Sequence, residues 1–165
     1  MKTLYLVRHA KSSWEHEELD DFERPLNKRG KRDAPYMARL LADKNVKVDL
    51  IISSPALRAY STARIFAKHL GYAKEKLKTN ELLYDANASA FFDVIHSIDD
   101  KVDSLMIFSH NPGITFLSNA LTSSFIDNIP TTGISCIELD VDSWKEVEAD
   151  KGKLLFFEYP KKYYH

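Results

Sequence analysis

A short apolar run that ends at two basic residues constrains this chain more than any other feature. Residues 3–7 read TLYLV, and this mixture of aliphatic, β-branched and aromatic side chains predicts a buried strand. Arg8 and His9 follow at once. Because ligands bind at the carboxyl ends of strands in open α/β sheets, the run predicts a strand that brings a cation and an imidazole to a binding edge.

A polar loop and a helix follow this strand. Residues 11–26 form a long polar loop, and we interpret its acidic part, residues 15–23, as a solvated face or as one that also repels anionic metabolites. Asn27 is suited to the N-cap position, and apolar residues recur at helical spacing from there to about Asp43. Pro35 falls inside this segment, so we expect either a kink there or a helix that begins near Asp33.

Strand-like and helix-like segments alternate along the rest of the chain. The predicted strands lie at residues 48–52, 77–79 and 104–108, and the predicted helices at about 55–70, 88–98 and 113–121. Ser54 can cap the first of these helices. Antiparallel strands are predicted at residues 134–139, 144–148 and 154–159. This order predicts a three-layer α/β/α fold, in which a mostly parallel sheet has antiparallel strands at one edge.

Length and composition narrow the classes of protein. A chain of 165 residues with 44% apolar content predicts a single domain spanning residues 1–165. The 23 basic and 24 acidic side chains nearly cancel, so we expect neither nucleic acid nor a membrane surface as partner. Cys136 is the only cysteine, which excludes an internal disulfide and fits a buried thiol in a reducing cytoplasm. We expect no signal peptide, and no apolar run approaches the roughly 18 residues of a membrane span.

Basic side chains recur at three predicted strand ends. Arg8 and His9 end the first strand, Arg58 falls in the first turn of the helix after the second, and His110 ends the strand at 104–108. Two guanidiniums and two imidazoles at one edge of a sheet suit a phosphoryl group, since arginine binds its oxygens in pairs and stays charged.

The same residues allow phosphoryl transfer without a metal or cofactor. An unprotonated imidazole nitrogen of His9 can attack phosphorus, and water can cleave the phosphohistidine that results. Nearby cations disfavour protonation of that ring and keep it reactive near neutrality. None of the five glycines forms a phosphate-binding loop of the GxxxxGK[ST] or GxGxxG kind.

Four motifs, in order, resemble those of the histidine phosphatase superfamily, whose fold is phosphoglycerate-mutase-like. They are Leu6-Val7-Arg8-His9-Ala10, Arg24-Pro25-Leu26 with Gly30, Ser53-Ser54-Pro55-Ala56-Leu57-Arg58-Ala59 with Thr62-Ala63, and Ser109-His110-Asn111-Pro112-Gly113. The short length, together with Lys11-Ser12-Ser13-Trp14 and Leu83-Tyr84-Asp85-Ala86, resembles the SixA-type phosphohistidine phosphatase branch.

The resemblance implies a role for each residue. His9 would be the nucleophile, while Arg8, Arg58 and His110 would hold the phosphate. Glu81 matches the position of the proton donor that some members have, with Asp85 as a close competitor and solvent as a third source. Lys11, Ser12 and Arg24 either line the pocket as substrate-binding groups or are ordinary loop residues.

The sequence therefore predicts a metal-independent, cytoplasmic phosphatase with a covalent intermediate on His9, most suited to phosphohistidine in a protein. The chain lacks the lid insertions of larger sugar-phosphate members, and an open pocket suits a protein side chain. A phosphatase of small phosphoesters or sugar phosphates is the nearest alternative. A non-catalytic module that binds phosphorylated partners is an alternative of another class.

Overall fold

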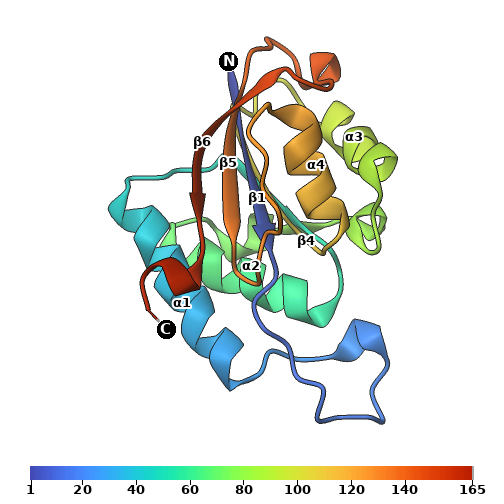
Figure 1. Cartoon of the computed structure of the whole chain (residues 1–165), viewed down its shortest axis with the longest axis vertical. Helices are drawn as coiled ribbons and strands as arrows, with labels where there is room; N and C mark the ends of the chain where they lie inside the picture. Colours follow the sequence, from blue (N-terminus) through green and yellow to red (C-terminus); the bar gives the residue numbers. More distant parts are fainter. Residues whose placement is uncertain (165) are drawn as a thin grey trace.

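Six strands form one mixed sheet in the computed structural model, which describes residues 1–164 (Figure 1). The strands are β1 (Lys2–Arg8), β2 (Leu50–Ser53), β3 (Lys78–Thr79), β4 (Ser104–Ser109), β5 (Ile134–Leu139) and β6 (Gly152–Glu158). They lie in the order β3-β2-β4-β1-β5-β6. The first four in this order are parallel, β5 is antiparallel to β1, and β6 is antiparallel to β5. This confirms the mostly parallel sheet with antiparallel strands at one edge.

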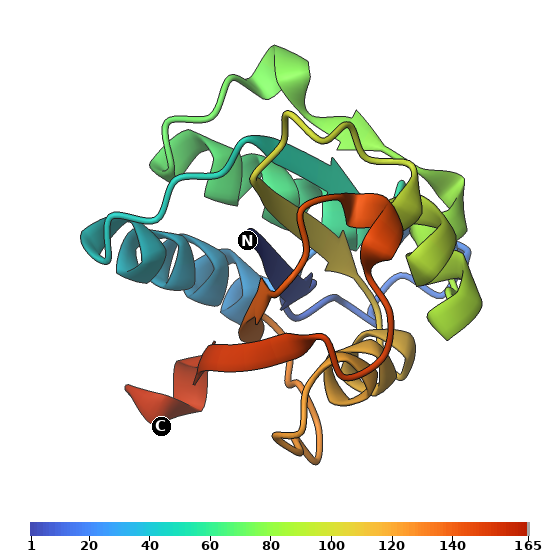
Figure 2. The same cartoon turned by 90° about the horizontal axis from the view of Figure 1, so that it is seen from above.

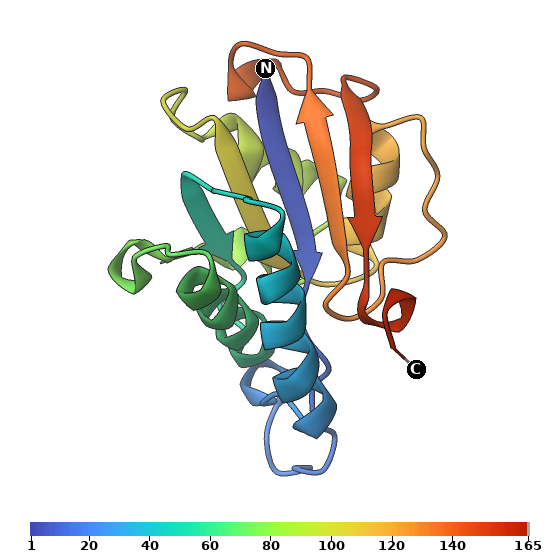
Figure 3. The same cartoon turned by 90° about the vertical axis from the view of Figure 1, so that its left-hand side faces the viewer.

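Two helices cover each face of the sheet (Figures 1 and 3). They are α1 (Lys28–Asp43) and α2 (Leu57–His69) on one face, and α3 (Ala88–His96) and α4 (Gly113–Leu121) on the other. Successive side chains of a strand point to opposite faces, so β1 serves both cores. Leu4 and Leu6 pack with the α3 and α4 residues, whereas Tyr5 and Val7 pack with those of α1 and α2. The three-layer α/β/α architecture is thus confirmed.

Helix α1 begins where its cap predicts. The side chain of Asn27 accepts a hydrogen bond from the backbone N–H of Gly30 at 2.9 Å. The helix continues through Pro35, so the alternative start near Asp33 is wrong. The buried apolar face of α1 offsets the hydrogen bond that the proline removes, because tertiary packing provides most of a helix's stability in proteins.

Two expectations about local structure are wrong. Residues 144–148 are not a strand but contain the 3-10 helix η4 (Trp144–Glu146), which the reciprocal capping box of Ser143 and Glu146 stabilises. Helix α2 begins two residues late, with Ala56 rather than Ser54 at its N-cap and no side-chain cap. The hydroxyl of Ser54 has another partner, described below.

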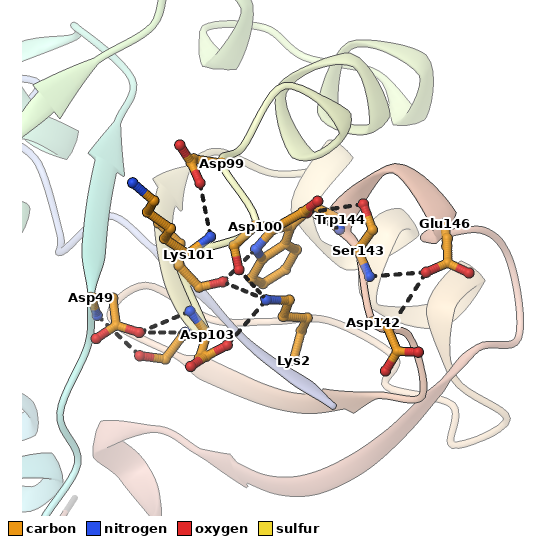
Figure 4. A network of polar contacts seen from close by, with 12 residues as sticks. Lys2, Asp49, Asp99, Asp100, Lys101, Asp103, Asp142, Ser143, Trp144 and Glu146 are labelled. Carbon is orange, nitrogen blue, oxygen red and sulfur yellow. Dashed lines mark hydrogen bonds and ion pairs between the residues drawn. The ribbon is translucent and has the colours of Figure 1, made fainter.

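A polar network holds the amino end of β1, at the opposite end of that strand from Arg8 (Figure 4). The ammonium group of Lys2 is buried and donates to the backbone oxygens of Asp100 (2.7 Å) and Val102 (3.0 Å) and to Oδ1 of Asp103 (3.0 Å). The indole N–H of Trp144 donates to the same Val102 oxygen at 2.7 Å. All three ammonium protons therefore have acceptors, and the network is structural.

Cys136 lies buried in β5, as expected for a structural thiol, and burial raises the pKa of this thiol to about 12. Across residues 1–164, no helix is both long enough and apolar enough to cross a bilayer.

Candidate active site

Three strand tips meet at one edge of the sheet. Arg8 is level with Ser109 in the β1–β4 register, and Ser53 is level with Phe108 in the β2–β4 register. His9 and His110 come directly after β1 and β4, and their ring centroids lie 5.2 Å apart. The loop over residues 11–26 lies below this edge (Figures 1 and 3).

A cavity of about 170 Å³ opens at this edge. It is lined by Arg8, His9, Lys11, Ser12, Trp14, Arg24, Arg58, His110, Asn111 and Thr131. Seven of the eight residues that the sequence nominates for the site are among them. The eighth, Glu81, is not in the lining.

The tautomer of His9 follows from its contact with the backbone. The ring is buried, and its Nδ1 lies 2.8 Å from the carbonyl oxygen of Ala10. A carbonyl can only accept, so Nδ1 carries the proton and Nε2 keeps a free electron pair. Burial, reinforced by the charges of His110, Arg58 and Arg8, lowers the pKa of His9 to about 3. His9 is therefore neutral at physiological pH.

Helices α1 and α2 hold the chain on either side of this histidine. The backbone N–H of Ala10 donates to Oγ1 of Thr62 at 2.9 Å, and that hydroxyl donates to the carbonyl of Arg58 at 2.7 Å. Gly30 of α1 lies against the backbone of Lys11, where a Cβ atom would be 2.1 Å from the carbonyl oxygen. Only glycine allows this close approach.

His110 is held by Ser54. The Nε2 atom of His110 lies 2.8 Å from Oγ of Ser54, which also accepts the backbone N–H of Ala56 at 3.2 Å. Nδ1 of His110 is buried with no hydrogen-bond partner among residues 1–164. Burial and the charge of Arg58 lower the pKa of His110 to about 4. Sequence reasoning took Ser54 as a helix cap, although its place at the end of β2 was a signal for a site residue.

Most donors of the Arg8 side chain have no hydrogen-bond partner among residues 1–164. Its Nη1 donates to the carbonyl of Ile129 at 3.1 Å, while its buried Nε has no partner within the described residues. Burial and the neighbouring charge of Arg58 lower the pKa of Arg8. Because arginine titrates far above neutrality, the group still stays charged.

Asp21 is a site residue that sequence reasoning missed. It lies in the 3-10 helix η1 (Asp21–Glu23), within the loop expected to be a solvated acidic face. Its carboxylate accepts hydrogen bonds from Arg58 (3.0 Å), Arg24 (3.1 Å) and the hydroxyl of Tyr84 (2.6 Å). The Tyr84 hydrogen bond, together with Arg58 and Arg24, lowers the pKa of this carboxyl group. Nothing in the local sequence singles out Asp21 among its acidic neighbours.

The rim of the cavity carries an exposed aromatic ring. The guanidinium carbon of Arg24 lies 3.4 Å from the centroid of the Trp14 ring, and Arg24 also donates to Oγ of Ser12. Trp14 is 73% exposed. The Trp14 ring and the Arg24 guanidinium that stacks on it both line the cavity.

The two candidate proton donors lie outside the cavity lining. Glu81 belongs to the 3-10 helix η3 (Glu81–Leu83), and Asp85 follows shortly after it. Both are exposed. Tyr84, between them, reaches the site, because its ring lies edge-on to His110 with centroids 5.5 Å apart.

The donor set in the described chain does not suit a metal ion. Across residues 1–164, no group of three or more His, Cys, Asp or Glu side chains is placed to bind one. The cavity lining instead contains four cationic side chains and two imidazoles. Such a lining favours an anion.

Comparison with known proteins decides the family. Residues 4–91 match the model of the histidine phosphatase superfamily (branch 1). The chain belongs to this superfamily. An uncharacterized protein of Mycobacterium leprae is 29% identical over 94% of this chain and all of its own length. An uncharacterized chloroplastic protein of Arabidopsis thaliana is 27% identical over 92% of this chain and 72% of its own.

Solved structures agree with this assignment. A protein provisionally named the phosphohistidine phosphatase SixA, from Agrobacterium tumefaciens, is 27% identical and superposes with a TM-score of 0.79 over 96% of this chain and 98% of its own. A protein histidine phosphatase SixA complexed with tungstate shares the fold at 20% identity, with a TM-score of 0.83 and coverage of 97% and 98%. This histidine phosphatase is thus of the SixA type and is a hydrolase with phosphatase activity.

Proposed function

We propose that this histidine phosphatase removes the phosphoryl group from phosphohistidine in a protein, with His9 as the nucleophile. The observation that carries the proposal is the hydrogen bond between Nδ1 of His9 and the Ala10 carbonyl. It leaves the Nε2 electron pair available beside two arginines and a second imidazole. The low pKa of His9, about 3, keeps that pair free of a proton.

In the first step, Nε2 of His9 attacks phosphorus and the bond from phosphorus to the substrate nitrogen breaks. The electron pair of that bond goes to the leaving imidazole, which takes a proton from solvent. Arg8, Arg58 and the Nδ1–H of His110, which has no partner among residues 1–164, bind the phosphoryl oxygens as charge develops on them. Water then attacks the phosphorus on His9, the bond from phosphorus to Nε2 breaks, and its electron pair returns to the ring. The proton that water loses passes to the phosphate or to solvent, and inorganic phosphate leaves.

The proton requirement favours an imidazole leaving group. Asp21 is the carboxylate that contacts the site arginines, but its lowered pKa keeps it ionised and makes it a poor acid. Glu81 and Asp85 lie outside the cavity. An alcohol needs a strong acid to leave, whereas a protonated imidazole leaves readily. The small volume of the cavity fits a phosphoryl group at the end of a side chain.

A phosphatase of small phosphoesters is the second candidate. This candidate is supported by the fold shared with the mycobacterial glucosyl-3-phosphoglycerate phosphatase. The identity is 14%, and the TM-score is 0.66 over 93% of this chain and 97% of the other. We would compare kcat/KM on a phosphohistidine peptide with kcat/KM on a panel of phosphorylated metabolites. The proposal predicts that the peptide is preferred. Preference for a metabolite by several orders of magnitude would contradict it.

A further inference from the structure

A second cavity adjoins the cavity that contains His9 and His110, which we call the catalytic cavity. Its volume is about 370 Å³, and Arg8, Lys11 and Thr131 line both cavities. The second cavity adds Arg29, Asn128, Pro130, Tyr159, Pro160 and Lys161. The two spaces therefore share one wall.

The topology explains why distant segments meet here. β6 is antiparallel to β5, which is antiparallel to β1, so β6 ends at the same edge of the sheet as β1. The 3-10 helix η5 (Pro160–Lys162) follows β6 and lies at that edge (Figure 3). The segment before β5 and the first turn of α1, which contains Arg29, complete the walls. In Figure 2 the carboxyl-terminal turn lies on the side of the sheet that α1 also occupies.

The lining of the second cavity is cationic. It contains Arg8, Lys11, Arg29 and Lys161, and within residues 1–164 no carboxylate lines it. Neither Lys11 nor Lys161 forms an ion pair with a described residue. Arg29 contacts Asp33 through Nε at 3.4 Å, which leaves its other donors for a ligand.

Neutral donors add to this charge. The Asn128 side-chain oxygen accepts from Asn111 at 2.7 Å, so its amide N–H groups remain free to donate. The phenol of Tyr159 belongs to the same lining. The reacting phosphoryl group already has Arg8, Arg58 and His110 in the catalytic cavity, so Arg29 and Lys161 are not needed to hold it.

We propose that this second cavity binds an additional anionic group of the substrate, a carboxylate or phosphate, next to the reacting phosphoryl group. The inference rests on the proposed function. The anionic group would come from an acidic side chain beside the phosphorylated residue of a protein, or from a second anionic group of a small substrate. Arg8, which lines both cavities, couples recognition of this group to the catalytic cavity.

The test measures binding, so that it does not depend on turnover. Two peptides carry a stable analogue of phosphohistidine, one flanked by aspartates and the other by alanines. We expect the acidic peptide to bind about three- to tenfold more tightly, and this ratio to shrink as salt is added. Lys161→Ala should bring the ratio of the two Kd values toward one, and Arg29→Gln should do the same.

Lys153→Ala is the matched control, because Lys153 is exposed on β6 and lies outside the cavity lining. It should leave the ratio of Kd values as in the parent chain. A ratio that Lys161→Ala and Lys153→Ala change alike would overturn the inference, and so would equal binding of both peptides together with equal binding of the two small compounds described next.

A second pair of probes distinguishes the sources of the anion. A phosphorylated hydroxy acid is compared with the phosphorylated alcohol that lacks its carboxylate. Discrimination only between the peptides supports a protein side chain, and discrimination only between the small compounds supports a metabolite. If neither pair is discriminated, the subsite does not exist. Failure of the proposed function is a separate result: the peptides bind and are discriminated, but no phosphohistidine is hydrolysed.

Discussion

Arg58 holds Asp21 through two hydrogen bonds, from Nη1 to the backbone oxygen at 2.6 Å and from Nη2 to the carboxylate at 3.0 Å. A carboxylate therefore occupies donors that a phosphoryl oxygen would also use. Because Asp21 is an exposed residue of the loop over residues 11–26, it can give way when an anion binds. This contact joins the loop to the first turn of α2.

Removal of the Asp21 charge should strengthen anion binding. In Asp21→Asn, the cost of placing phosphate beside a carboxylate disappears, and we expect the Kd for tungstate or inorganic phosphate to fall by about three- to tenfold. Isothermal titration calorimetry measures this Kd in the variant and in the parent chain. Asp20→Asn is the control, since it removes a charge one residue away and keeps the cap of η1. Weaker binding in Asp21→Asn than in Asp20→Asn would contradict the competition.

Loss of Arg58 should impair activity far more than stability. Arg58→Ala removes a cation from the catalytic cavity, and we expect kcat/KM to fall by about a hundred- to a thousandfold. The melting temperature should change by less than about 4 °C, because the guanidinium contacts an exposed loop rather than the core. Arg64→Ala, an exposed position of the same helix, should alter neither quantity. A large fall in melting temperature for Arg58→Ala would show a structural role.

The two buried imidazoles should make stability depend on pH. Burial lowers the pKa of His9 to about 3 and of His110 to about 4. In the unfolded chain, both return to about 6.5. Between these values the unfolded chain binds more protons, so the free energy of unfolding decreases as the pH falls from about 6.5 toward 4.

Urea denaturation at pH 7 and pH 5 measures this effect. The loss of stability between the two pH values should be smaller in the His9→Gln His110→Gln double variant than in the parent chain. His16→Gln, at an exposed position of the loop, should leave the loss unchanged. An equal loss in the parent chain and the double variant would show that these imidazoles do not cause it.

Chelators should not affect turnover. Nucleophilic attack by His9 and charge stabilisation by arginines need no Lewis acid, and the described residues include no group of donors placed for a metal ion. Activity after dialysis against EDTA should equal activity before it, with or without added Mg²⁺. Inhibition by EDTA that added Mg²⁺ reverses would contradict the metal-independent mechanism.

The sequence predicts the edge that carries the site because local patterns determine that edge. The apolar run before Arg8 and the run before His110 each define a buried strand, and parallel pairing of β1 with β4 brings their ends together. Thr62 and Gly30 stand within the motifs that resemble those of the family, although their contacts, a hydroxyl under the Ala10 N–H and a close approach to Lys11, join segments far apart in the sequence. Motifs of this kind are visible in the chain itself.

The missed features depend on how segments far apart in sequence fold against each other. Asp21 resembles its acidic neighbours until the loop returns to α2 and Tyr84. Lys161 belongs to the second cavity only because β6 ends at the same edge as β1. Trp144 and Val147 are both buried, and their spacing of three residues fits a 3-10 turn rather than the two-residue alternation of a strand; the Ser143 and Glu146 capping box favours the same 3-10 helix.

The nucleophilic role of His9 is tested most directly by trapping its phosphorylated form. The chain is mixed with a peptide carrying labelled phosphohistidine, quenched within one turnover, and digested under alkaline conditions, in which phosphohistidine survives. The account predicts label on the peptide that contains His9, no label in His9→Ala, and full labelling in His16→Ala. Label that persists in His9→Ala, or hydrolysis by that variant at the parent rate, would contradict it.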